Sequence, residues 1–247
     1  MINNLDKFLE DFREIFNENN LHREQLKGIV EKLNEIFENA FDKSMDKTSE
    51  LVASFILGTK DNSLISDKES YDAYIKHHLE TLQYLKSRIT NPVFSKSTFA
   101  NMEIEDFKNA FELDKKILVR LVCIDRIIND KEYSIDNLYF ETAGSLINRL
   151  KQSHTDWNFL IELMDKRVRN ASSHLDFYYD EHNYVFRGKD VNNRSKTISE
   201  FTITPAEFIG VIMPNAMDII QAFIAAGILL CLKPYDEYHK QALSIIR

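Results

Sequence analysis

The chain has 247 residues, a length that suits one large domain or two small ones. Apolar residues make up 44% of it and charged residues 28%, so it can bury a core and is not a disordered chain. Only 6 glycines and 4 prolines occur, which predicts long helices with few turns. The formal net charge of −8 excludes a protein that coats nucleic acid with a broad basic surface, so any RNA contact must be local.

The two cysteines, Cys123 and Cys231, each lie within an apolar helical pattern. We expect two free thiols, without a disulfide framework or a zinc site. The N-terminal segment MINNLDKFLEDFREIF is amphipathic and acidic and has no apolar signal core. The longest apolar run, near residues 222–232, is shorter than a membrane span requires. These features predict a soluble, cytoplasmic protein that does not insert into a membrane.

Apolar residues at helical spacing predict helices over residues 2–18, 21–44 and 70–90, with a short helix over 49–57. The segment TNPVFSKSTFANM, residues 90–102, contains Pro92 and many small polar residues. This composition is typical of a long connection or a domain boundary. We therefore expect an N-terminal helical region over residues 1–90, which would serve sensing or dimerisation, and a second helical domain over residues 104–247.

In the second domain the pattern predicts helices over residues 104–129 and 135–151, and another that carries an apolar stripe from Trp157 to Ala171. A β-hairpin of residues 175–179 and 184–187 follows, and then a polar loop and an extended stretch at 198–204. The residues TPAE begin the last long helix, with Thr204 as its N-cap and Pro205 in its first turn. The predicted fold class is all-α: a helical bundle with a small β-hairpin insert between the last two long helices.

The stretch DKRVRNASSHLDFYYD places Arg169 next to Asn170, and His174 follows four residues later. On a straight helix Asn170 and His174 share a face, while Arg169 lies about 140° from His174. Arginine and histidine would then meet only if the helix end loosens, if the arginine wraps round, or if a second subunit supplies one of them. These residue types suit RNA cleavage without metal: histidine transfers protons, arginine holds the phosphate and asparagine orients one of them.

The spacing alone is a weak signal, because the pair Arg149 and His154 repeats it in the same chain. A solvated helix C-terminus would also favour arginine and histidine, through the helix dipole. The context of residues 169–174 distinguishes them: an asparagine after the arginine, small residues before the histidine, an amphipathic helix before the motif, and a hairpin and a long helix after it.

The residues RNASSH resemble the Arg-Asn-x3-His motif of the HEPN superfamily (higher eukaryotes and prokaryotes nucleotide-binding domain). The resemblance covers residues 104–232 and implies an α-helical domain. It also implies a homodimeric, metal-independent ribonuclease of toxin–antitoxin or antiviral defence systems, with an antitoxin or another defence protein as a possible partner. By position, Arg169 and His174 would be catalytic and Asn170 supporting, and no cofactor or metal is implied.

Basic residues surround the motif and could form either a local track for RNA phosphates or a charged loop without that role. The residues expected to bind RNA are Lys166, Arg167, Arg187 and Lys189. The aromatic residues of the hairpin would stack bases or pack the hairpin onto a core. The adjacent His77 and His78 point about 100° apart on a helix, which disfavours binding of one metal ion by both rings. We therefore expect both histidines to lie at the surface.

The sequence thus predicts an endoribonuclease that uses 2′-OH attack and leaves a 2′,3′-cyclic phosphate. One alternative is a non-catalytic HEPN-like helical module that binds a protein partner or RNA, which the net charge of −8 favours. A further alternative is a structural helical dimer in which the motif only caps a helix.

Overall fold

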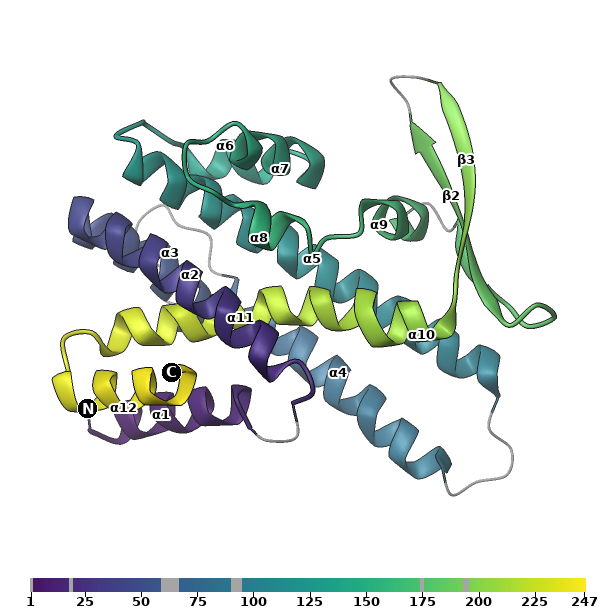
Figure 1. Ribbon diagram of the computed structural model, residues 1–247, viewed down its shortest axis with the longest axis horizontal. Helices are drawn as coiled ribbons and strands as arrows, with labels where there is room; N and C mark the ends of the chain where they lie inside the picture. Colours follow the sequence, from purple (N-terminus) through teal and green to yellow (C-terminus); the bar gives the residue numbers. More distant parts are fainter. Residues whose placement is uncertain (1, 18–19, 59–66, 90–94, 174–175, 193–195) are drawn as a thin grey trace. The chain divides into compact units, whose positions relative to one another are not determined.

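The computed structural model describes residues 2–17, 20–58, 67–89, 95–173, 176–192 and 196–247. The chain is mostly helical and has one small antiparallel sheet (Figure 1), so the all-α class is correct at the coarse level. It divides into two compact units, which we call the first unit (Met1–Glu69, Lys115–Ile161 and Asp218–Arg247) and the second unit (Ser70–Asp114 and Glu162–Met217). The division into residues 1–90 and 104–247 stays a prediction.

The elements have the following bounds. The first unit contains the helices α1 (Ile2–Ile15), α2 (Arg23–Lys43), α3 (Met45–Ile56), α6 (Ile135–Tyr139), α7 (Ala143–Lys151), α8 (Asn158–Ile161) and α12 (Asp236–Ile246). The second unit contains α9 (Lys166–Ser173), β1 (Phe177–Asp180), β2 (Val185–Asn192), β3 (Thr197–Ile203), α10 (Pro205–Glu207) and the π-helical segment η1 (Phe208–Ile212). Three long helices have residues in both units: α4 (Lys68–Ile89), α5 (Lys96–Ile128) and α11 (Met213–Leu232).

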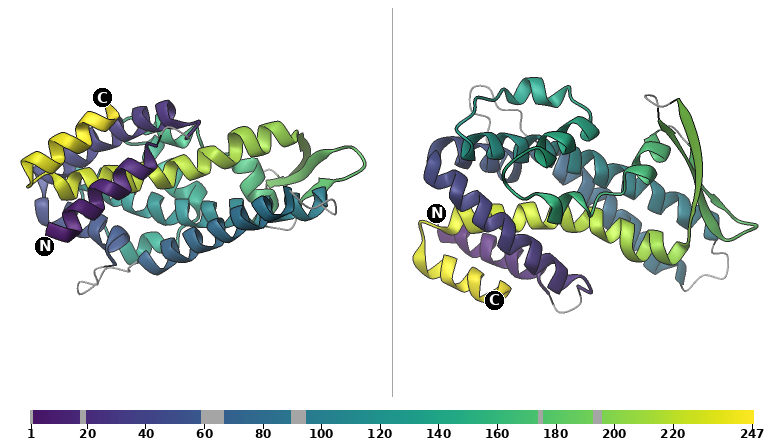
Figure 2. Two further views of the ribbon diagram at one scale, coloured as in Figure 1. Left: turned by 90° about the horizontal axis from the view of Figure 1, so that it is seen from below. Right: turned by 45° about the horizontal axis from the view of Figure 1, so that its top comes forward.

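In the first unit, the helices at the two ends of the chain, α1 and α12, lie side by side (Figure 2). The apolar stripe predicted for α2 is buried, with Leu26, Leu33 and Phe37 fully enclosed. Gly227 of α11 lies so close to α3 that a Cβ atom there would be 2.2 Å from a side-chain atom of Ile56. Glycine thus allows close packing of α11 on α3 at this point.

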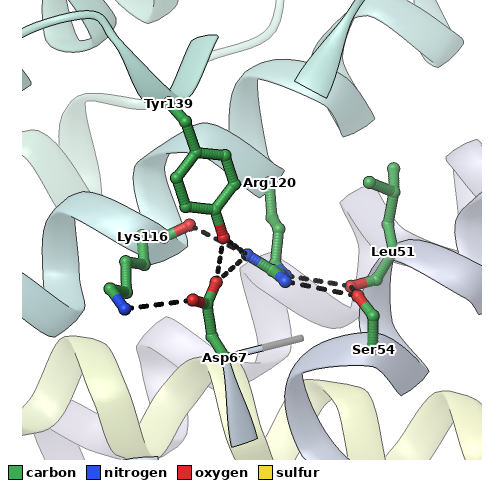
Figure 3. Close-up of polar contacts among 6 residues, drawn as sticks. All are labelled: Leu51, Ser54, Asp67, Lys116, Arg120 and Tyr139. Carbon is green, nitrogen blue, oxygen red and sulfur yellow. Dashed lines mark hydrogen bonds and ion pairs between the residues drawn. The ribbon is translucent and has the colours of Figure 1, made fainter. Parts of the chain in front are cut away.

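A buried polar network also stabilises the first unit (Figure 3). The Arg120 side chain is fully buried and donates to the Asp67 carboxylate over 2.5 Å. It also donates to the Tyr139 hydroxyl over 3.0 Å and to a main-chain carbonyl of α3 over 3.2 Å. Lys116 approaches the other Asp67 oxygen to 3.1 Å. The buried arginine is therefore paired and hydrogen-bonded, as a charge in a protein interior must be.

In the second unit, the three strands form an antiparallel sheet in the order β1-β2-β3. One face of the sheet carries an aromatic cluster, in which Phe208 of η1 lies 4.5 Å from Phe186 and 5.3 Å from Phe177 between ring centroids. On the same face, Gly188 leaves room for the ring of Phe201, because a Cβ atom would lie 2.2 Å from it. This face packs against α9 and η1, which places α9 beside β2 (Figure 1).

Three predicted helix boundaries were wrong. α5 begins at Lys96, so residues 96–102 of the predicted connection are helical. The helix predicted over 135–151 is interrupted between α6 and α7, because Thr142 caps a new helix by accepting from the Ser145 main-chain N–H. The helix predicted from Trp157 to Ala171 is likewise divided into α8 and α9.

The predicted hairpin is present as β1 and β2, but the insert is larger. β2 continues through residues 188–192, which were predicted as a loop, because β3 pairs with it over seven residues. The TPAE helix start is correct: the Thr204 hydroxyl accepts from the Glu207 N–H and Pro205 lies in the first turn. A few residues on, η1 precedes Pro214, which has no N–H for the α-helical bond.

The helical stretch Pro205–Leu232 is longer than the predicted apolar run. By length and composition alone its 28 residues, with a mean hydropathy of 1.8 over the most apolar part, suffice to cross a membrane. However, 78% of that part is buried inside the protein, which is typical of a core helix. Both cysteines are free thiols; Cys123 is buried, and burial raises its pKa to about 12.

Candidate functional site

Helix α9 carries the candidate site, and its start is fixed by Asp165. The Asp165 carboxylate accepts from the main-chain N–H groups of Arg167 at 2.9 Å and of Val168 at 3.1 Å. This is the N-cap arrangement, and a carboxylate there also complements the helix dipole. Val168 and Ala171 are fully buried, so they anchor one face of the helix. Arg169 and Asn170 are half-buried beside that face.

The Asn170 side chain links Arg169 to the sheet. Arg169 Nη1 donates to Asn170 Oδ1 over 3.0 Å, and Asn170 Nδ2 donates to Asp190 Oδ1 over 3.1 Å. Arg169 also lies over the ring of Phe111 in α5, with 5.6 Å between its Cζ atom and the ring centroid. A cation–π contact and a hydrogen bond thus help to orient the guanidinium, and Asn170 connects it to the Asp190 carboxylate.

The predicted trio is placed only in part. Arg169 and Asn170 lie together in α9, as expected. His174 lies outside the described residues, so its role and its distance from Arg169 stay predictions.

The basic residues expected to bind RNA lie on different faces. Lys166 and Arg167 are exposed at the start of α9, where Arg167 pairs with Asp165 over 2.8 Å. Side chains alternate along a strand, so Arg187 and Lys189 point away from the face that Asp190 turns towards α9. Arg187 pairs with Asp180 over 2.6 Å, and hydrogen bonds from Asn183 and then from Arg187 lower the pKa of that carboxyl. RNA binding by these four residues remains a prediction.

A shallow hollow of about 400 Å³ lies beside the start of α9. Lys166 and Arg167 line it together with Glu207, Val211 and Asn215 from the stretch after the sheet. The hollow thus combines basic, acidic and apolar side chains. Its lining holds two basic side chains and the three carboxylates of Glu162, Asp165 and Glu207, so the hollow has no excess of positive charge.

The other pair with the same spacing has a different environment. Arg149 forms a two-point bond with the Glu141 carboxylate, at 2.9 and 2.6 Å. This bond lowers the pKa of Glu141. Arg149 therefore lies in the last turn of α7, bonded to Glu141, while His154 is exposed.

A second polar cluster in the second unit was missed by the sequence analysis. His78 of α4 is mostly buried, and its Nδ1 lies 2.6 Å from Oδ2 of Asp106 in α5. The expectation of a surface residue was wrong for His78. The signal was the four-residue spacing from Tyr74, which places both rings on one helix face, where they stack. Leu79 and Leu82 of the same helix, although apolar, are exposed.

Two further carboxyl groups of α5 share this part of the second unit. Burial, and then the charge of Asp106, raise the pKa of Glu103 to about 7. Asp114 is fully buried, and burial raises its pKa as well. Within the described ranges, no three histidine, cysteine or carboxylate side chains converge to hold a metal ion. Burial thus keeps protons on these two carboxyl groups at a higher pH than is usual for them.

Searches of protein-family models, curated proteins and solved structures found no match to this chain. The resemblance to the HEPN superfamily therefore rests on residues 169–174, and the function must be argued from the chemistry of the site.

Proposed function

We propose that this chain is a metal-independent endoribonuclease of the HEPN type, acting as a prokaryotic defence or toxin effector. The observation that carries the proposal is the setting of Arg169. Its guanidinium is half-buried, lies over Phe111 and is oriented by the carbonyl of Asn170. A guanidinium oriented in advance can bind a phosphate and stabilise the charge that develops in the transition state.

In the proposed reaction the ribose 2′-oxygen attacks the adjacent phosphorus atom and the bond from phosphorus to the 5′-oxygen breaks. One product carries a 2′,3′-cyclic phosphate and the other a 5′-hydroxyl. His174 would take the proton from the 2′-hydroxyl or deliver one to the 5′-oxygen. Arg169 would hold the phosphate oxygens, and Asn170 would hold the arginine. Two protomers would face each other, so that both copies of the motif line one cleft.

The experiment is an RNA cleavage assay in EDTA with the purified full chain. We expect the wild type to cut RNA and to leave cyclic-phosphate ends, and Arg169→Ala and His174→Ala each to lower the rate by about 100-fold or more. Arg149→Ala and His154→Ala are the matched controls, because this pair repeats the spacing while Arg149 is bonded to Glu141. Equal losses in both pairs, or cleavage that persists in His174→Ala, would contradict the proposal.

The alternative is a non-catalytic HEPN-like module that binds a protein partner or RNA. Two of the four basic residues, Arg167 and Arg187, form ion pairs with acidic neighbours, and this favours the alternative. Several RNAs left intact by the wild type, together with RNA binding that Arg169→Ala weakens, would support this module instead of the nuclease.

A further inference from the structure

Asp190 lies at the far end of the hydrogen-bond chain that begins at Arg169. It is twenty residues from Asn170 in sequence, and it comes from β2. Its half-buried carboxylate accepts from the Asn170 amide, whose carbonyl faces Arg169. The sheet insert and the arginine of the motif are therefore connected through a single side chain.

The polarity of this connection explains why residue 170 is an asparagine. The guanidinium has only donors and an ionised carboxylate has only acceptors. A side chain between them needs an acceptor at one end and a donor at the other, which an amide provides in one orientation only. An aspartate at 170 would face Asp190 with like charge, and an alanine would leave both neighbours without this link.

The strand that carries Asp190 is held by its neighbours in the sheet. β2 pairs with β3 through Asp190, which lies opposite Ser199, and it pairs with β1 as far as Gly188. The Lys189 N–H also donates to the Asp176 carbonyl over 3.1 Å, just before β1. A strand with neighbours on both edges places its side chains more firmly than a loop does.

We propose that Asp190 is a positioning residue, which orients Arg169 by holding the Asn170 amide with its carbonyl towards the guanidinium. That this orientation serves RNA cleavage rests on the function proposed above. Asp190 does not contact the reacting phosphate in this account, and the sheet thereby becomes part of the site.

The test exchanges the two partners in the full chain. Asn170→Asp alone sets two carboxylates against each other. Asn170→Asp combined with Asp190→Asn restores one donor and one acceptor at the contact and keeps the net charge of the wild type. Asp180→Asn is the matched control, because it also removes a carboxylate from the sheet but lies at the end of β1, bonded to Arg187. The readouts are the Arg169 Nε–H signal in nitrogen-15 spectra and the rate of RNA cleavage.

We expect Asn170→Asp and Asp190→Ala to shift the Arg169 signal and to lower kcat about tenfold or more, with a smaller change in KM. The double variant should return both readouts towards the wild type, and Asp180→Asn should change neither. The proposal is overturned if the Arg169 signal does not shift in the folded single variants, or if the double variant does not restore it. If the wild type cuts no RNA but the Arg169 signal follows the exchange, the nuclease fails while the orientation of Arg169 by Asp190 stands.

Discussion

Asp106 and His78 are joined side chain to side chain, with 2.6 Å between Oδ2 of the carboxylate and Nδ1 of the ring. The carboxylate is 2% exposed, whereas the histidine is 17% exposed. This contact joins α4 to α5 within the second unit. The histidine lies on the face of α4 that carries Tyr74, where the two rings stack. A buried carboxylate that loses its partner is costly, so the histidine has a clear structural role.

His78→Ala should therefore lower the free energy of unfolding by about 2–4 kcal/mol, because it leaves Asp106 buried without its closest partner. His77→Ala is the matched control. Its ring is 41% exposed and approaches Asp106 only to 4.0 Å, so we expect a loss below about 1 kcal/mol. Urea unfolding of both variants at pH 7 measures the difference. Equal losses in the two variants would show that the 2.6 Å contact of His78 contributes no more to stability than the 4.0 Å approach of His77.

Glu103 predicts a pH dependence of stability. Its pKa is raised to about 7 in the folded protein, above the ordinary value of 4.5. Between these values the folded state holds a proton that the unfolded state has released, so this group makes stability fall as the pH rises from about 4.5 to 7. Glu103→Gln should remove this fall and add about 1–3 kcal/mol to stability at pH 8 relative to wild type, with little change at pH 4.

The control for Glu103 is Glu105→Gln, because Glu105 is an exposed glutamate that pairs with Lys108. Unfolding curves for the three proteins from pH 4 to pH 8 give the comparison. A wild-type profile that keeps its slope in Glu103→Gln would assign the pH dependence to another group.

Arg120 makes the strongest prediction for the first unit. Arg120→Met removes the guanidinium that pairs with Asp67, a carboxylate only 1% exposed, and should cost about 3–5 kcal/mol. Arg149→Met is the matched control, since its two-point bond to Glu141 is exposed and should contribute about 1 kcal/mol or less. Adding Asp67→Asn to Arg120→Met should recover part of the loss, because the buried side chain that lost the guanidinium is then neutral. Thermal and urea unfolding test all of these variants, and additive losses would contradict the coupling.

The sequence predicted well those elements whose cause is local. The stripe of α2 and the capped start at Thr204 depend on neighbours a few residues away, and both are correct. The break between α8 and α9 was missed, because the apolar residues from Trp157 to Ala171 keep a helical spacing across it. The start of α9 depends on one capping carboxylate, that of Asp165. The spacing of apolar residues does not reveal such a cap.

The site could be predicted only as far as its contacts are close in sequence. Arg169 and Asn170 are adjacent, so their association was visible in the motif. Asp190 was missed because β2 was expected to end at Arg187 before reaching it. Residues 188–192 continue the strand because they pair with β3. The sequence alone does not reveal this long-range pairing, since this segment is mostly polar and contains a glycine.

Gly188 offers a way to disturb that sheet without touching a charged side chain. Gly188→Ala would place a Cβ atom 2.2 Å from the ring of Phe201, so the ring or the strand must shift, and we expect a loss of about 1–3 kcal/mol. Gly28→Ala in α2 is the control, because the new Cβ has no atom within 4 Å beyond its chain neighbours and the adjacent backbone of its own helix, and alanine favours a helix. Combining Gly188→Ala with Phe201→Leu should recover part of the loss, because a smaller side chain leaves room for the new methyl group.

If the strand rather than the ring shifts in Gly188→Ala, Asp190 moves with the strand, and the Arg169 signal changes as it does in Asp190→Ala. An unchanged signal in a destabilised variant would mean that the ring absorbs the strain and that β2 keeps Asp190 in place.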